Sequence, residues 1–288
     1  MRIGLAFTMA VAALLTLAAC TQATPPITIG DGRLTNQWPA LPEPVSWRPA
    51  AGTCHQSFLA NLHRTAYEPV DCAAQHQYET VHVGDFVPEV KEPAHQQAWA
   101  DCDAKTAAFL GGQWRDRQIW IGVSLPSPEA WSGGARWYAC QAGAASWVGH
   151  PKITFVGSIR QGFDSLPNLR WGCGQQPEHG EYQPLECDQP HNSEFAGTFP
   201  LDVPFAEVEA KYADNDPLFH QGCLKVIAKF IGVRDEQALA SRTGSSYWLP
   251  DESDWTAGDR SVRCHLWTGS RQVTRSLEGA GAAALPTR

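Results

Sequence analysis

Two histidine–glutamate pairs carry the side chains that acid–base or metal chemistry requires. His76 precedes Glu79 by three residues, and His191 precedes Glu194 by the same spacing. Such a pair could act as general acid and general base, or supply two ligands to a metal ion. Side chains three residues apart on an extended chain point to opposite faces, and no third or fourth ligand is evident. We therefore favour a structural role, in which each pair bonds itself or the backbone where a loop meets a strand, and we expect no metal and no cofactor.

Two arginines, Arg136 and Arg260, follow a tryptophan and a glycine and are candidates for anion binding. A guanidinium group suits the carboxylates or phosphates of a cell-wall polymer. The competing interpretation is a structural turn, in which the glycine takes positive φ and the arginine bonds carbonyl groups or Asp259. Ala135 stands where the first copy of the turn would need an aspartate. Since the rest of the turn recurs and the aspartate does not, we favour the structural interpretation.

Covalent catalysis has no support in the motifs of the chain. The sequence contains no Gly-x-Ser-x-Gly, Ser-x-x-Lys or His-Glu-x-x-His pattern. The chain has 12 tryptophans, which would suit carbohydrate binding. Several of them occupy positions with a core pattern, namely Trp99, Trp131, Trp248 and Trp255. We predict that the protein is not an enzyme.

The candidate residues belong to a stretch that occurs twice. Leu249 to Cys264 and Leu125 to Cys140 both place a tryptophan five positions after a proline and a cysteine nine positions after that tryptophan. Upstream, a cysteine with a histidine four positions later and a glutamate seven positions later also recurs. Matches at so many fixed spacings indicate an internal repeat. We predict two modules, residues 51–163 and 168–280, followed by a tail at 281–288.

The chain has nine cysteines, and eight of them fall into two sets of four. An even number of cysteines is typical of an oxidising compartment. If the four cysteines of each module pair with one another, and both modules use the same pattern, three pairing schemes remain. We favour the scheme in which the first cysteine of a module pairs with the second and the third pairs with the fourth. It gives the disulfides Cys54–Cys72, Cys102–Cys140, Cys173–Cys187 and Cys223–Cys264. A metal site is the alternative, but the cysteines lie far apart and no Cys-x-x-Cys pair occurs.

Periodicity predicts the elements that position these residues. In the first module, we expect strands at 80–86, 119–123, 137–141 and 153–156, and a helix from Pro93 that Gly111 ends. In the second module, we expect strands at 195–199, 247–249 and 262–266, a closing segment at 272–277, and a helix at 208–233 broken near 214–217. The fold class is therefore α+β, with each module an antiparallel sheet and one main helix that the third–fourth bridge ties to the sheet.

The N-terminal segment has the pattern of a lipoprotein signal peptide. Arg2 precedes an apolar run from Leu5 to Ala19, which is too short for a stable membrane span. The run ends in Leu17-Ala18-Ala19-Cys20, the form of a lipobox. We predict a signal peptide at 1–19, lipidation of Cys20, and a proline-rich tether at 20–50. An ordinary signal peptide with a chance cysteine is the alternative.

The order of these motifs resembles that of the septum formation-related domain family. The residues that carry the resemblance are Cys187, Pro190, His191, Glu194, Cys223, Pro250, Trp255, Gly258, Asp259, Arg260, Cys264, Ser276 and Leu277. The first module is more divergent, since Gln75 replaces the proline and Ala135 the aspartate. The resemblance implies a secreted or membrane-anchored protein with a role in the cell envelope or division and no defined enzymatic activity.

Three hypotheses about function follow from these patterns. The first is a lipid-anchored, non-enzymatic binding or scaffolding protein on the outer face of the bacterial cytoplasmic membrane. The second is a pair of cell-wall glycan-binding modules that use tryptophan and arginine. The third is an envelope hydrolase or metal enzyme around His191 and Glu194. A formal net charge of −8 without a basic cluster argues against nucleic acid as a partner.

Overall fold

The computed structural model describes residues 47–145, 153–166, 169–177, 182–214, 217–234, 239 and 241–286. These residues belong to one compact unit, Ser46–Arg288. The predicted signal peptide at 1–19, the predicted lipidation site Cys20 and all but the last four residues of the predicted tether lie outside the described part of the chain.

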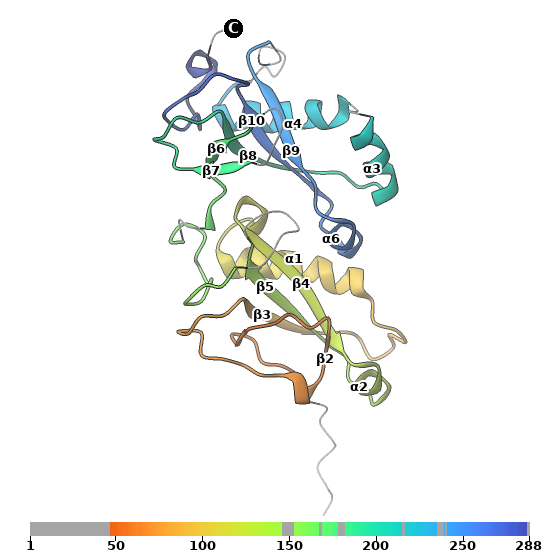
Figure 1. Ribbon diagram of the computed structural model, residues 1–288. Coiled ribbons are helices and arrows are strands. Elements are labelled where there is room, and N and C mark those ends of the chain that lie inside the picture. The colour runs from red at the N-terminus through yellow and green to blue at the C-terminus, as the bar shows by residue number, and fades with distance from the viewer. Residues whose placement is uncertain are drawn as a thin grey trace, which may run out of the picture. The chain divides into compact units, whose positions relative to one another are not determined.

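The N-terminal half contains a five-stranded sheet with the strand order β1–β3–β5–β4–β2 (Figure 1). Its strands are β1 (Cys54–His55), β2 (Asn61–Leu62), β3 (Tyr78–Asp85), β4 (Ile119–Pro126) and β5 (Trp137–Ala144). Its helices are α1 (His95–Leu110), the short α2 (Pro128–Ser132) and the single turns η2 (Arg64–Ala66) and η3 (Trp114–Asp116).

One edge of this sheet differs from the expected antiparallel arrangement. Strand β2 pairs with β4 in parallel, with Asn61 opposite Leu125. A parallel pair needs a long connection between its strands, and the segment that contains β3 and α1 provides it. The expectation of a purely antiparallel sheet is therefore wrong at β2.

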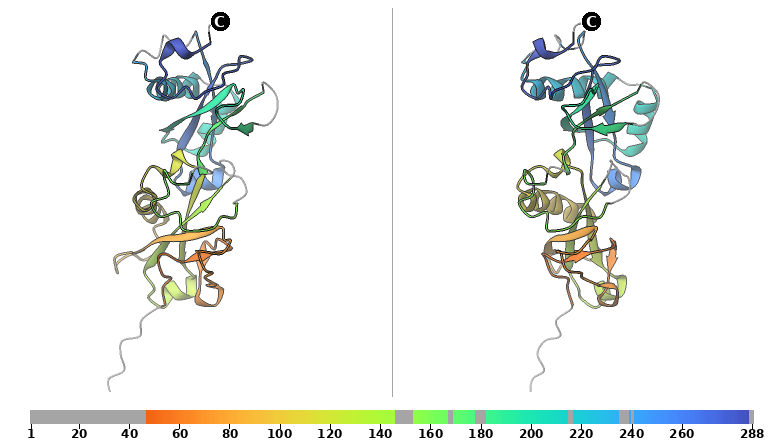
Figure 2. Two further views of the ribbon diagram at one scale, coloured as in Figure 1. Left: turned by 90° about the vertical axis from the view of Figure 1, so that its left-hand side faces the viewer. Right: turned by 60° about the vertical axis from the view of Figure 1, so that its left-hand side comes forward.

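Helix α1 forms because its apolar residues recur at helical spacing and face the sheet. Its buried residues are Ala98, Trp99, Cys102, Thr106, Phe109 and Leu110. Gly111 ends the helix in the left-handed conformation, with φ of 88°, and its N–H bonds the carbonyl of Ala107. The helix packs on β3, β4 and β5 (Figure 2). The predicted end at Gly111 is confirmed.

The C-terminal half contains a second five-stranded sheet, with the order β7–β6–β8–β10–β9. Its strands are β6 (Cys173–Gln175), β7 (Gln183–Leu185), β8 (Ser193–Pro200), β9 (Gly244–Trp248) and β10 (Ser261–Trp267). Its helices are α3 (Phe205–Ala213), α4 (Pro217–Ile231), α6 (Glu252–Ala257) and the turn η5 (Ala282–Ala284). Helix α4 packs on β8, β9 and β10, and its separation from α3 matches the predicted break near 214–217.

The two sheets share the order of four strands. In each sheet, the strand with the first cysteine lies beside the strand with the glutamate, and that strand lies beside the strand with the fourth cysteine. The next strand is β4, which ends in the Leu-Pro motif, or β9, which ends one residue before it. The fifth strand differs, since β2 extends one edge of the first sheet and β7 extends the other edge of the second. The fold class is mixed α+β, as predicted; the duplication itself stays a prediction from the sequence.

The segments expected to close each sheet do not form full strands. Residues 153–156 and 272–277 make only isolated bridges, His76 with Phe155 and His191 with Val273. Both segments turn away after one bridge to meet a glutamate, as described below, and this turn ends the pairing. The predicted strand at 153–156 is therefore wrong.

Each half has its own apolar core. The first includes Trp99, Trp114 and Ile121, and the second includes Phe219, Ile227 and Trp255. Leu169 packs in the first core. Leu285, in the segment 281–288 that the sequence analysis set apart as a tail, is only 2% exposed and packs in the second. Residues 282–285 thus contribute to the C-terminal core.

Candidate functional site

Four disulfides fix the loops that carry the candidate residues. They join Cys54–Cys72, Cys102–Cys140, Cys173–Cys187 and Cys223–Cys264, the pairs favoured from the sequence. Two of them tie a helix to a sheet, α1 to β5 and α4 to β10. The other two hold the loops that precede β3 and β8. These eight sulfurs are oxidised and are therefore neither nucleophiles nor metal ligands.

Glu79, at the start of β3, holds the chain where it returns after β5. One carboxylate oxygen accepts a bond from Ser158 Oγ at 2.7 Å, and the other accepts the N–H of Ile159 at 2.9 Å. Ser158 Oγ in turn accepts the N–H of Arg160 at 3.0 Å. Both oxygens of this buried carboxylate are therefore bonded to one turn, one to a serine hydroxyl and the other to a backbone N–H.

Glu194, at the start of β8, makes the same arrangement in the other half. Its carboxylate accepts bonds from Ser276 Oγ and from the N–H of Leu277, the latter at 2.8 Å. Ser276 Oγ accepts the N–H of Glu278 at 3.1 Å. Burial raises the pKa of the Glu194 carboxyl, and the bonds from Ser276 and Leu277 offset only part of that effect. We call these two arrangements the glutamate clamps.

His76 and His191 anchor the same returning segments by their backbones. His76 exchanges two hydrogen bonds with Phe155, at 3.0 and 2.8 Å, and His191 exchanges two with Val273, at 2.9 and 2.8 Å. Each ring also bonds a carbonyl two residues earlier through Nδ1, to Ala74 at 2.9 Å and to Gln189 at 2.7 Å. A carbonyl can only accept, so Nδ1 carries the proton in both rings.

Both histidine rings are fully buried, and neither Nε2 has a partner among the described residues. The histidine and the glutamate of each pair therefore hold one returning segment together. This arrangement agrees with the structural role that the sequence favoured, and it gives the two pairs no access to a substrate.

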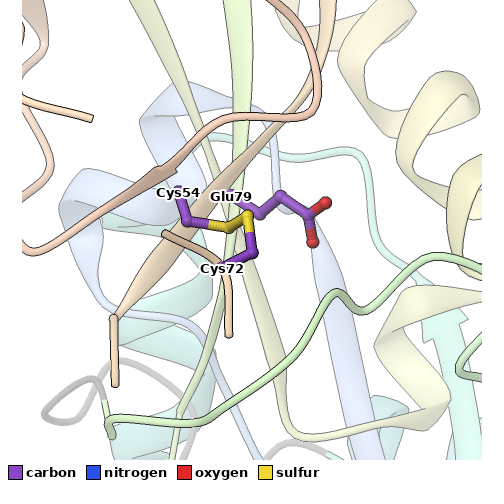
Figure 3. Close-up of side chains that lie close together, drawn as sticks. All are labelled: Cys54, Cys72 and Glu79. Carbon is purple, nitrogen blue, oxygen red and sulfur yellow. A yellow bond between two sulfur atoms is a disulfide. The ribbon is translucent and has the colours of Figure 1, made fainter. Parts of the chain in front are cut away.

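Two groups in the described residues bring sulfur and carboxylate atoms within 4.8 Å of one another: Cys54 with Cys72 and Glu79, and Cys173 with His191 and Glu194. Figure 3 shows the first, in which the Glu79 carboxylate points away from the Cys54–Cys72 disulfide. Zinc is bound by thiolates, and the cysteines of both groups are disulfide-bonded. These groups are therefore disulfides packed beside the clamps.

Arg136 takes the structural role expected of the turn. Its Nη1 donates to the carbonyls of Trp131 at 2.7 Å and Ala135 at 2.9 Å. Its guanidinium lies 4.3 Å from the centre of the Trp131 ring, within the range of a cation–π contact. The Nη1 group of Arg136 is therefore bonded within the turn itself.

Comparison of the sequence with known protein families gave a match. A model of the family described as Septum formation matches residues 51–264. The chain belongs to the Septum formation family. The matched range includes residues 163–168, where we predicted the boundary between the two modules. Neither curated proteins nor solved structures gave a significant match.

The described part of the Septum formation chain contains no helix that is both long and apolar enough to cross a membrane.

Asp259 makes contacts that the sequence did not predict. Arg260 bonds Asp202 at the surface, not Asp259. Asp259 is 4% exposed and accepts bonds from Arg263 at 3.0 Å, Arg115 at 3.0 Å and Ser261 at 2.5 Å. Burial alone would raise its pKa, but Arg263 and Arg115 outweigh burial and hold the pKa below its usual value. Of the two partners that the structural interpretation allowed for the arginine of the turn, carbonyl groups or Asp259, the pairing of Arg260 with Asp259 is therefore wrong.

The contact of Arg115 with Asp259 was not predicted, because no local sequence pattern indicates it. It lies in η3 of the N-terminal half, 144 residues before Asp259, and also bonds Asp103. The nearby Trp120 Nε1 donates to Asp254 at 2.8 Å. These two contacts link the halves of the unit, and a single-sequence pattern cannot show such a pairing.

The tryptophans of the repeated turn are core residues. Trp131 and Trp255 are buried, and Trp255 Nε1 donates to the carbonyl of Val203 at 2.8 Å. Trp99 is also buried, as its pattern predicted, whereas Trp248 is only half-buried and packs against His265 with the two rings tilted. The buried rings therefore stabilise the fold and are not placed for carbohydrate stacking.

Proposed function

We propose that this Septum formation protein is a lipid-anchored binding or scaffolding protein of the bacterial cell envelope that acts in division. The family match gives the general role in division or the envelope. The lipobox motif ending at Cys20 supports anchorage on the outer face of the cytoplasmic membrane. The proline-rich tether then separates the folded unit from the lipid surface.

The observation that carries the non-enzymatic part of the proposal is the pair of glutamate clamps. A general acid or base must reach a substrate proton. Glu79 and Glu194 are buried, and both carboxylates are already bonded to a serine hydroxyl and a backbone N–H. A hydrolase centred on His191 and Glu194 would need this clamp to open, so the clamps favour a scaffold.

Localisation tests the proposal in cells. We would express the full chain with a C-terminal epitope tag and image it in dividing cells. The matched control carries residues 1–50 fused to a reporter, so that it has the predicted anchor and tether without the fold. The proposal predicts enrichment of the full chain at septa and an even membrane distribution of the control. Equal distributions of the two proteins would contradict a role of the fold in division.

A further inference from the structure

A small cavity lies on the face of the first sheet opposite α1. Its volume is about 130 Å³. Its inner lining includes the buried residues His55, Ser124 and Gln141. Apolar side chains of Leu59, Leu62, Ala66 and Val70 form one wall, and Gln56, Ser57 and Glu68 lie exposed at its rim.

A buried chain of hydrogen bonds sets the polar side of this cavity. Thr80 Oγ1 donates to Gln141 Oε1 at 3.1 Å, and His55 Nε2 lies 3.2 Å from the same hydroxyl. The side-chain carbonyl oxygen of Gln141 therefore already accepts a hydrogen bond from Thr80. No acceptor in the described part of the chain bonds Gln141 Nε2, so its amide hydrogens remain for a ligand with a carbonyl oxygen.

The corresponding place in the second sheet is filled. Gln141 pairs with Thr80 across β5 and β3, and the equivalent pair across β10 and β8 is His265 with Phe195. The rings of Trp248 and Tyr182 pack against His265, with centroids 4.1 and 5.4 Å away. The second sheet thus has an aromatic cluster on the face where the first sheet has a polar cavity.

The size of the cavity limits what it can hold. Pockets for whole small molecules measure roughly 300–1,000 Å³, so a complete sugar ring does not fit. A dry cavity of about 150 Å³ accepts benzene, which has six heavy atoms. An acetamido group has four, and it combines a carbonyl acceptor, an N–H donor and a methyl group.

These features fit one chemical class. We propose that the cavity binds the N-acetyl group of an amino sugar in a cell-wall glycan. The acetyl oxygen accepts from Gln141 Nε2, the methyl group packs on Leu62 and Ala66, and the amide N–H faces Glu68 at the rim. The lining holds no lysine or arginine, so a carboxylate or phosphate would meet Glu68 without a counter-charge.

An acetyl group also fits better than a peptide bond. The acetyl methyl is a chain end and can enter a small cavity from its rim, whereas a backbone amide continues on both sides. The inference deepens the proposed function by naming a ligand class, and it is tested in solution with purified protein. Its failure would therefore leave the result of the localisation experiment unaffected.

The test is an NMR titration of the full chain with a trimer of N-acetylglucosamine, and with the glucosamine trimer as the deacetylated control. One small group gives weak binding, so millimolar ligand is used. The proposal predicts shifts at residues around Gln141 with the acetylated trimer, and at least tenfold weaker binding of the deacetylated one. Equal binding of the two trimers would overturn it, as would no binding of the acetylated trimer. Binding of a blocked dialanine peptide in its place would identify a peptide as the occupant.

Two variants in the same helical turn locate the site. Ala66→Leu fills the cavity from its wall, while Thr65→Leu adds comparable bulk at an exposed neighbour outside the lining. We expect Ala66→Leu to weaken binding at least tenfold and Thr65→Leu to leave it unchanged, with both variants folded by circular dichroism. Gln141→Leu should weaken binding about tenfold through the lost donor. If Ala66→Leu is folded and binds like the original chain, the cavity is not the site.

Discussion

At the residue scale, the two glutamate clamps show how far the sequence predicts a role. The spacing of His76 and Glu79 favoured a structural role, in which the pair bonds itself or the backbone where a loop meets a strand. Ser276 and Leu277 were recognised only as part of a motif. Their bond to Glu194 spans 82–83 residues, and no local spacing encodes such a contact. The residue types were therefore predictable and their partners were not.

His265 makes folding sensitive to acid. It is fully buried, and burial lowers its pKa to about 3 from an ordinary value of 6.5. Below pH 6.5 the His265 ring is protonated in the unfolded chain. In the folded protein the same ring stays neutral until the pH falls to about 3. The stability contributed by neutral His265 is therefore full above pH 6.5 and falls by about 1.4 kcal/mol per pH unit below it. Urea unfolding between pH 7 and 4 measures this slope.

The control for His265 separates its effect from that of other titrating groups. His265→Leu should have a flatter dependence of the unfolding free energy on pH than the original chain. His63→Leu, at an exposed histidine, should retain the original slope. A His265→Leu variant with an unchanged slope would show that this ring does not cause the acid sensitivity.

Asp259 and Asp202 provide a matched pair of aspartates, one buried and one exposed, each bonded to arginine. Asp259→Asn removes the charge that compensates Arg263 and Arg115, and should destabilise by about 3–5 kcal/mol. Asp202→Asn removes only the surface pair with Arg260, and should cost about 0–1 kcal/mol. Chemical denaturation at pH 7 measures both. Equal losses would contradict the central place of Asp259 in the buried network.

At the element scale, long periodic segments were predictable and very short ones were not. The spacing of apolar residues and Gly111 predicted helix α1. The alternation of apolar and polar residues predicted the strand that the structure has as β10, Ser261–Trp267. Strands β1 and β2 have two residues each, too few to show a period of two. They form because tertiary pairing and the Cys54–Cys72 bridge hold them at the sheet, and this information is absent from local pattern.

The disulfide between α4 and β10 should stabilise more than the one that precedes β8. Cys223 and Cys264 are 41 residues apart, whereas Cys173 and Cys187 are 14 apart. In the chain-entropy account, the longer loop gives about 4 kcal/mol and the shorter about 3 kcal/mol. Replacing each pair by alanine and measuring the unfolding free energy tests this order. A larger loss from Cys173→Ala with Cys187→Ala would contradict it.

At the scale of the whole unit, the two cores are linked by contacts that follow no local rule. The sequence predicted two modules with separate cores, and each half does have its own apolar cluster. It did not predict that Arg115 and Trp120 of the first half would bond Asp259 and Asp254 of the second. Such long-range pairing depends on the folded arrangement of both halves.

Gly258 tests this link between the halves. Its φ is +136°, and a Cβ there would lie 1.9 Å from Cδ1 of Trp99. Gly134, at the same place in the first copy of the turn, has φ of +97° and open space around it. Both alanine variants carry a backbone penalty of about 1–2 kcal/mol, but only Gly258→Ala also forces Trp99 away. Thermal unfolding should show a larger loss for Gly258→Ala, and equal losses would contradict the contact.

The proposed function requires a lipid on Cys20 that holds the folded unit at the envelope. Membrane fractionation of cells that express the full chain or Cys20→Ala tests it most directly. The account predicts that the original protein sediments with membranes and is released by detergent. It predicts that Cys20→Ala appears in the medium or accumulates as the longer, unprocessed chain. If Cys20→Ala has the same size and the same membrane fraction as the original protein, the lipid-anchor account is contradicted.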